Sequence, residues 1–331
     1  MATAFVTGAT GFIGCHVARL LLEKGWNVRA IKRQPAVPSL SRLKDDVDWH
    51  IGDIRDLDSV SRAMQGCGVV FHVAADYRLW SRDPAELYET NVGGTRNVLE
   101  AALAAKAERV VHTSSVGALG LSQDGSPADE NTPVCLDDMV GHYKRSKFLA
   151  EREADELVRR GLDLVIVNPS TPVGPCDHKP TPTGKIIVDF LNGRMPAFLN
   201  TGLNLVHVTD VASGHILALE KGRTGEKYIL GNQNMTLAEI FQRLQGISGV
   251  PAPRFCLPYR PVLALAHVCE AISRFTGKEP MIPFEGVKMA KRLMFFDSTK
   301  AVSQLGLPQT PVETALEDAV RWFQENGYVT N

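Results

Sequence analysis

Three glycines, Gly8, Gly11 and Gly14, follow the first apolar segment of this chain and strongly constrain its fold. Residues 3–7 have the apolar, β-branched composition of a buried strand, and residues 12–24 have the apolar spacing of an amphipathic helix. Glycines between a strand and a helix permit a tight turn, a close approach of backbone to a pyrophosphate, and close packing of helix on sheet. The helix N-terminus adds N–H groups and a partial positive charge. The segment therefore predicts a dinucleotide-binding unit.

The same alternation of short apolar runs and helical patterns continues to residue 169. Further strands are predicted at 27–32, 47–51, 69–74, 109–114 and 162–168, and long helices at 84–105 and 141–160. These strands are apolar almost throughout, as expected when helices cover both faces of a parallel sheet. We therefore expect an α/β fold whose Rossmann-type, doubly wound parallel sheet occupies residues 1–169.

Residues 170–331 lack the regular alternation of strand and helix patterns, and they begin with a proline-rich stretch. Shorter helices are predicted at 186–192, 210–219, 237–247, 260–276, 284–292 and 312–324, with a strand at 228–230. We expect a smaller, mixed substrate-binding region that closes over the cofactor, with some of its elements free to return to the main sheet.

Composition limits the partners and the compartment. The formal net charge of −1 gives no overall field to attract nucleic acid or an anionic membrane, local basic clusters excepted. The N-terminus lacks a charged leader, and the apolar stretch 262–272 is interrupted by His267 and Glu270, so neither a signal peptide nor a transmembrane anchor is expected. The six cysteines lack zinc-type spacing, and His207 and His215 lack a third ligand. We expect a cytoplasmic protein with reduced thiols and no metal.

The strand ends predict how a dinucleotide would be held. The second strand of NAD-binding domains commonly ends in an acid that binds the ribose hydroxyls. Here it ends in lysine and Arg33, and an arginine suits a 2′-phosphate. We therefore predict NADP(H), with NAD(H) as the alternative. Asp53 is placed to accept a hydrogen bond from the adenine amino group, or else caps a helix. Ala74 and Ala75 leave room for the cofactor against the sheet, and Asn91 is a candidate for fixing a ribose or a water.

Tyr143 and Lys147 lie one turn apart and therefore share a face of the predicted helix 141–160. The ordinary pKa of tyrosine is about 10, and a nearby ammonium favours the phenolate, which makes the phenol a usable acid or base near neutral pH. Ser114 and Ser115 end the fifth strand, where a hydroxyl can bind a carbonyl oxygen. A Tyr–Lys pair alone is often a surface pair, but with the glycine turn it indicates nicotinamide hydride transfer.

These motifs are similar to those of the extended short-chain dehydrogenase/reductase superfamily over essentially the whole chain. The similarity is also carried by GD at 52–53, HVAA at 72–75, NVGGT at 91–95, TSS at 113–115 and VHVTDV at 206–211. Within the superfamily, VRAIKR at 28–33 and VGP at 173–175 resemble the dihydroflavonol-reductase-like group. AADYRLW at 74–80 and NPSTPVGP at 168–175 most resemble the hopanoid-associated sugar epimerases.

The resemblance implies roles for the catalytic residues. Tyr143 would be the acid/base and Lys147 would lower its pKa, while Ser115, or its competitor Ser114, would orient the reacting oxygen. The backbone at Pro169 and Ser170 would meet the nicotinamide amide. The full set of expected cofactor contacts is Gly8, Thr10, Gly11, Phe12, Ile13, Arg33, Asp53, Ile54, Ala74, Ala75, Asn91, Ser114, Tyr143, Lys147, Pro169 and Ser170.

The substrate pocket is expected to include Asp76, Tyr77, Trp80, Thr171 and His178. Tyr77 and Trp80 are suited to pack against an apolar ring or a sugar face, or else form ordinary packing of a lid. The resemblance also implies a homodimer built on the helices 84–105 and 141–160.

Three functions are compatible with these residues. The leading hypothesis is an NADP(H)-dependent reductase of a ketone or aldehyde. The alternative is an NAD(P)-dependent epimerase or dehydratase of sugars or nucleotide sugars, linked to hopanoid biosynthesis. Such epimerases usually carry an arginine before VHVTDV to grip the diphosphate, and residues 201–206 hold no cation, although Lys179, Lys185 or Arg194 are possible substitutes. A non-catalytic dinucleotide sensor is disfavoured because Tyr143 and Lys147 are both present.

Overall fold

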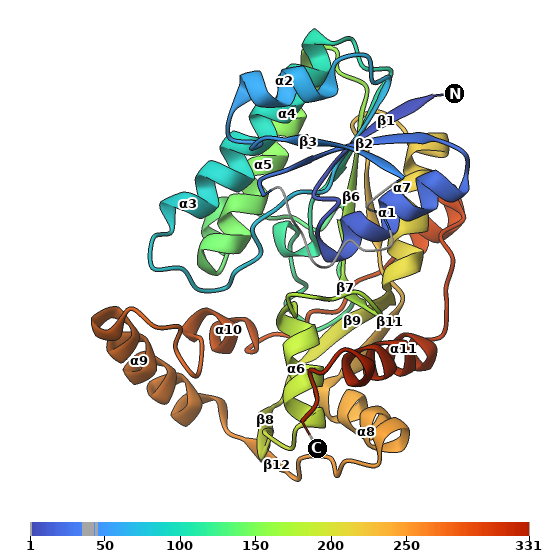
Figure 1. The fold of residues 1–331 in the computed structure, drawn as a ribbon. Coiled ribbons are helices and arrows are strands. Elements are labelled where there is room, and N and C mark those ends of the chain that lie inside the picture. Colours follow the sequence, from blue (N-terminus) through green and yellow to red (C-terminus); the bar gives the residue numbers. More distant parts are fainter. Residues whose placement is uncertain (1, 35–42, 44–45, 331) are drawn as a thin grey trace.

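The computed structural model describes residues 2–34, 43 and 46–330. Within these residues, seven parallel strands form one sheet in the order β10-β6-β5-β4-β1-β2-β3 (Figure 1). Their bounds are β1 Thr3–Thr7, β2 Asn27–Lys32, β3 Val47–Ile51, β4 Val69–His72, β5 Arg109–Thr113, β6 Leu164–Pro169 and β10 Lys227–Leu230. The reversal of strand order at β1 and β4 makes the sheet doubly wound, so the predicted fold class is confirmed.

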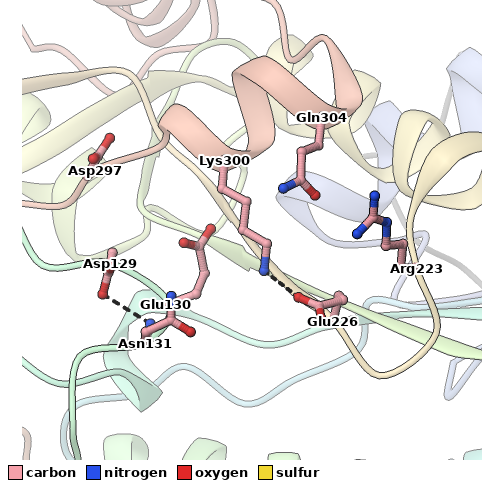
Figure 2. A pocket seen from close by; sticks show the side chains of 8 residues that line it. All are labelled: Asp129, Glu130, Asn131, Arg223, Glu226, Asp297, Lys300 and Gln304. Carbon is pink, nitrogen blue, oxygen red and sulfur yellow. Dashed lines mark hydrogen bonds and ion pairs between the residues drawn. The ribbon is translucent and has the colours of Figure 1, made fainter.

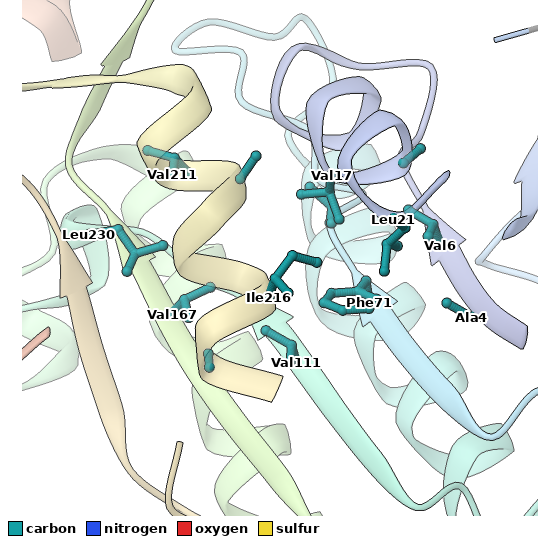
Figure 3. Close-up of a cluster of buried hydrophobic side chains, with 14 of the residues drawn as sticks. Ala4, Val6, Val17, Leu21, Phe71, Val111, Val167, Val211, Ile216 and Leu230 are labelled. Carbon is teal, nitrogen blue, oxygen red and sulfur yellow. The ribbon is translucent and has the colours of Figure 1, made fainter. Parts of the chain in front are cut away.

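Helices cover both faces of this sheet because alternate strand residues point to opposite sides. Val111 of β5 joins the core beneath α1 (Phe12–Glu23) and α7 (Val208–Lys221), whereas its neighbour Val110 joins the other core. That second core lies under α2 (Leu57–Met64), α4 (Gly94–Ala104) and α5 (Gly141–Arg159). Figure 3 shows Val17 and Ile216 from α1 and α7 meeting strand side chains in the first core.

Two predicted elements in this half have different bounds. The strand predicted at 69–74 ends at His72, because the N–H groups of Val73 and Ala74 instead donate to Thr7 Oγ1, each at 3.1 Å. The helix predicted at 84–105 is divided into α3 (Ala85–Tyr88), a π-helical turn η2 (Glu89–Gly93) and α4. π-helical turns are frequent at functional sites because they redirect a side chain, here Asn91.

The second half is built on a three-stranded mixed sheet within the described residues, in the order β11-β9-β7. Its strands are β7 Thr171–Val173, β9 Gly202–His207 and β11 Gln233–Thr236, and a smaller pair is β8 Ala197–Leu199 with β12 Phe255–Leu257. The helices α6 (Pro182–Leu191), α8 (Leu237–Ser248) and α11 (Val312–Glu325) enclose a third core. The strands other than β10 were not predicted, and all of them except β9 have only three or four residues.

Elements from the second half also complete the main sheet. β10 pairs in parallel with β6 at the sheet edge, and α7 packs against the same sheet. Two further helices, α9 (Tyr259–Thr276) and α10 (Phe284–Met289), stand apart from the body on one side (Figure 1). The remaining short helical segments are η3 Val116–Ala118, η4 Leu136–Asp138 and η5 Ala301–Leu305.

Candidate active site

The glycine turn between β1 and α1 is closed so tightly that side chains are excluded. Gly8 has φ +73°, and a Cβ there would lie 2.6 Å from the backbone nitrogen of Ala74. A Cβ at Gly14 would lie 2.1 Å from the carbonyl oxygen of Gly8. The N-cap of α1 is Gly11, which supplies no side-chain hydrogen bond, and no acid occupies the first turn. This uncapped helix start fits the phosphates of a dinucleotide, and it contains the predicted contacts Thr10, Phe12 and Ile13.

The ends of β2 and β3 hold the predicted adenosine contacts. Arg33 is exposed directly after β2, as the NADP(H) prediction requires. The carboxylate of Asp53 is already engaged by the Arg55 guanidinium, with Nη2 at 2.7 Å from Oδ2, and this hydrogen bond lowers the pKa of Asp53. The helix cap is Asp56, which accepts from Asp58 N at 3.1 Å, so the alternative of Asp53 as a cap is wrong. Ile54 is buried beneath α4.

The Tyr–Ser pair predicted to act on substrate is assembled at the carboxyl end of β5. Tyr143 lies in the first turn of α5, close enough to the Ser115 hydroxyl for that hydroxyl to act on the pKa of the phenol. Ser115 Oγ accepts from Gly117 N at 2.9 Å, which fixes its rotamer. Burial raises the pKa of Tyr143, and the neighbouring Ser115 hydroxyl opposes part of this rise. The phenol is therefore protonated at neutral pH.

Lys147 is buried in α5, one turn after Tyr143. Its Nζ donates to the carbonyl oxygen of Thr113 at 2.8 Å. Burial lowers the pKa of Lys147 to about 8, partly opposed by the charge of Glu151. The predicted effect of this ammonium on the phenol stays a prediction, and in the structure the ammonium links α5 to the end of β5.

Several buried polar atoms near this end of the sheet lack partners among the described residues: Ser114 Oγ, Ser170 Oγ and Asn168 Oδ1. A buried polar group left without a hydrogen bond costs about 1–3 kcal/mol, so such atoms indicate that a ligand completes them. The Ser170 N–H is already bonded to Leu230 O at 3.0 Å. The expected contact of the Pro169–Ser170 backbone with the nicotinamide amide stays a prediction, and the unpartnered Ser170 hydroxyl lies beside it at the end of β6. The arrangement fits the amide and ribose of a nicotinamide.

The chain is similar to known proteins in sequence and in fold. Residues 4–231 match the NAD dependent epimerase/dehydratase family. The chain belongs to this family. It is 49% identical, over 98% of its own length and 95% of the relative, to a Synechocystis protein named putative dihydroflavonol 4-reductase. It is 36% identical, over 99% and 100%, to sterol demethylase protein B of Methylococcus capsulatus. The crystal structure of gox2253 matches with a TM-score of 0.89 and 47% identity, covering 100% of both chains.

The predicted superfamily, the extended short-chain dehydrogenases/reductases, is therefore confirmed, and the protein is an enzyme of an NAD-dependent family. In the described part of this enzyme, no helix is long and apolar enough to cross a membrane.

The side-chain amide of Asn91 links the loop after β4 to α5. Its Nδ2 donates to Asp76 O at 2.8 Å and to Ser146 Oγ at 2.9 Å, and its Oδ1 accepts from Asp76 N at 2.7 Å. Both amide hydrogens are therefore used within the protein, while Oδ1 keeps a second lone pair. The expected contact of Asn91 with a ribose or a water stays a prediction. The π-helical turn directs Asn91 so that it holds the loop after Ala74 and Ala75 against α5.

The predicted substrate residues lie on two facing segments. Asp76 is paired with Arg78, and Tyr77 donates to Lys179 O at 2.9 Å, which joins the loop after β4 to the segment after β7. Burial raises the pKa of Tyr77 to about 12, so this hydroxyl stays a donor. Trp80 and Thr171 are partly buried. His178 packs instead on α11, with its ring 4.9 Å from the Trp322 centroid.

One cluster of metal-ligand-type side chains was not predicted, because its members are distant along the chain. Cys15, His16 and Cys176 place ligand-type atoms within 4.8 Å of one another, where α1 meets the loop after β7. Both His16 nitrogens are engaged, Nε2 with Pro175 O and Nδ1 with Arg19 Nη2, each at 2.9 Å. The expectation of no metal rested on chain spacing, which cannot detect such a cluster.

Figure 2 shows the residues that line a polar pocket of about 400 Å³. Lys300 pairs there with Glu226 at 2.6 Å, and Asp129 Oδ1 accepts from Asn131 N at 3.0 Å. Its lining includes none of the predicted site residues. The candidate active site is instead the end of the sheet where the glycine turn, Ser114, Ser115 and Tyr143 meet.

Proposed function

We propose that this enzyme reduces a ketone or aldehyde with NADP(H), and that Tyr143 donates the proton. The observation that carries the proposal is the hydroxyl pair of Ser115 and Tyr143, with the phenol kept protonated by burial. A bound nicotinamide would supply the hydride. Ser115 would hydrogen-bond the carbonyl oxygen and Tyr143 would protonate it as negative charge develops, which is general acid catalysis. A protonated phenol suits reduction better than oxidation, because oxidation needs a base.

The relatives support the reductase assignment at the level of reaction class. The Synechocystis relative is named a putative dihydroflavonol 4-reductase, which favours a reductase. In an epimerase of this family, an arginine that binds the diphosphate would be expected in the segment that forms β9. In this protein, the residues of β9 make other contacts. Asn204 in this strand donates to Asn234 Oδ1 at 2.9 Å, and Gly202 lies against Phe295. These contacts are structural and leave no cation there.

The cofactor preference is tested by titrating the purified enzyme with NADPH and NADH. We expect NADPH to bind at least tenfold more tightly, about 1.4 kcal/mol, because the Arg33 guanidinium complements a 2′-phosphate. Arg33→Ala should remove most of this preference while barely changing NADH binding. Arg152→Ala, an exposed arginine on α5, is the matched control and should keep the preference. Tighter binding of NADH, or an unaltered preference in Arg33→Ala, would refute the assignment.

The second candidate is a sugar epimerase or dehydratase, including one acting in hopanoid biosynthesis, and the family description favours it. Such an enzyme oxidises and re-reduces one substrate, so oxidised NAD should remain bound through purification. The three substitute cations are exposed, and Lys185 is paired with Asp189 at 3.4 Å, which weakens this candidate. Release of stoichiometric NAD⁺ on denaturation, with turnover of a nucleotide sugar without added cofactor, would favour it.

The expected dimer through α4 and α5 is tested separately by light scattering.

A further inference from the structure

The segment 254–292, here called the arm, contains α9 and α10 and projects from the body (Figure 1). Ten large apolar side chains are exposed in the described part of the chain, and seven of them lie in the arm. They are Phe255, Leu257, Leu265, Val268, Ile272, Phe275 and Met281. Exposed apolar groups scattered singly need no explanation, but a concentration of them marks an interaction surface.

Four of these residues form a continuous stripe along α9. Leu265, Val268, Ile272 and Phe275 follow one another at intervals of three, four and three residues, which at about 100° per residue places them on one face. They are 48%, 55%, 57% and 94% exposed. The side of α9 that faces the protein holds only the small residues Ala266 and Ser273 as buried positions. The helix thus presents its larger apolar face to solvent.

Two arginines border the stripe. Arg260 and Arg274 lie fourteen residues apart, so they form a cation row along one flank of the stripe, with the His267 ring between them against Phe284. Arg274 lies 3.9 Å from Glu270, one turn earlier on the same helix. The whole arm carries seven lysines and arginines against three glutamates, whereas the chain as a whole has a net charge of −1. The arm is therefore a basic, amphipathic element on a nearly neutral protein.

We propose that the arm docks the enzyme on an anionic lipid bilayer, with the stripe of α9 inserted among the acyl chains and the cation row at the headgroups. A helix with an apolar face and flanking arginines lies in the membrane interface in this way. A second copy of the chain fits less well, because an isologous contact would gather both copies' cations at one interface. The bilayer supplies the opposite charge.

Docking would bring the active site to the membrane. At the base of the arm, Glu285 of α10 accepts a hydrogen bond from His142 N at 3.1 Å, directly before Tyr143. The arm therefore borders the start of α5, where the proposed acid lies, and its outer face is separate from the residues assigned to catalysis.

Co-sedimentation of the full-length enzyme with vesicles tests this docking. We expect binding to phosphatidylcholine vesicles containing phosphatidylglycerol, and at least tenfold weaker binding to phosphatidylcholine alone. The double variant Ile272→Glu/Phe275→Glu should lose binding. Neutralising one flank arginine, as in Arg274→Gln, should weaken binding about fivefold, since a basic residue near the surface contributes about 1 kcal/mol. Val302→Glu is the matched control, because Val302 is 39% exposed but lies outside the arm, and it should bind like the wild type.

Two results would overturn the proposal. The first is vesicle binding that is absent from the wild type or unchanged in Ile272→Glu/Phe275→Glu. The second is a wild-type dimer in light scattering that dissociates in the same variant without any vesicle binding, which would assign the stripe to a second copy. NADPH titration of each variant shows that the fold is retained, and its outcome is independent of vesicle binding.

Discussion

Replacing Tyr143 by phenylalanine is expected to lower kcat for carbonyl reduction by about 10²–10⁴-fold, the usual contribution of a positioned general acid. The substitution removes one oxygen from a partly buried ring that lies beside the Ser115 hydroxyl. Because Ser115 Oγ keeps its bond from Gly117 N, the loop should hold its shape. NADPH affinity should therefore change by less than about threefold, and the loss should appear in kcat. Steady-state kinetics with a screened carbonyl substrate, together with fluorescence titration of NADPH, measure both.

Tyr88→Phe is the control for this variant. Tyr88 Oη lies 3.2 Å from His142 Nδ1, so it is a tyrosine beside the site that has no role in the proposed proton transfer. Its removal should leave kcat nearly unchanged. The pH profile gives an independent check, because burial raises the pKa of Tyr143 above its ordinary value of about 10, so the phenol should remain a proton donor up to that pH. Full activity in Tyr143→Phe would remove Tyr143 as the acid, and would revive the interpretation of the protein as a dinucleotide sensor.

The parts of the fold that were predictable are those in which local chemistry and tertiary packing demand the same residues. β1 and α1 were predicted to within a residue because the glycine turn between them and the apolar periods on either side are all local signals. The strands β7 and β9 were missed because tertiary pairing alone stabilises them; Pro172 even interrupts the donors of β7.

The site was predictable as a set of residues but not as a set of contacts. Ser115 and Tyr143 do meet, since the carboxyl end of a strand and the start of the next helix are neighbours in this fold. Asn91 and Lys147 were placed correctly on their helices, but their hydrogen bonds go to Asp76 and Thr113. Each of these side chains has several polar groups within reach. A π-helical turn and burial decide which of them it bonds, and neither has a pattern in the sequence.

Gly14→Ala is expected to lower both stability and NADPH affinity, because the added methyl group clashes with the turn between β1 and α1. The variant tests this turn by steric exclusion alone. Gly14 is helical and lacks a positive φ, so alanine is not disfavoured by the backbone there. The added Cβ would nevertheless lie 2.1 Å from the Gly8 carbonyl oxygen, and the turn must shift to accept it. We expect a loss of about 1–3 kcal/mol in the free energy of unfolding, as in other overpacked sites. Because the shifted turn carries the predicted phosphate contacts, NADPH affinity should fall about tenfold or more, which corresponds to about 1.4 kcal/mol.

The chain supplies a graded control series for this prediction. A Cβ at Gly11 would lie 3.2 Å from the same carbonyl oxygen, and a Cβ at Gly246, inside α8, would meet nothing within 4 Å. Gly246→Ala should therefore gain about 0.5–1 kcal/mol of stability and bind NADPH normally, because alanine loses less conformational freedom than glycine in a helix. Gly11→Ala should fall between the two. Thermal unfolding and NADPH titration of the three variants decide the matter: equal affinities across the series would mean that the turn between β1 and α1 does not hold the cofactor phosphates.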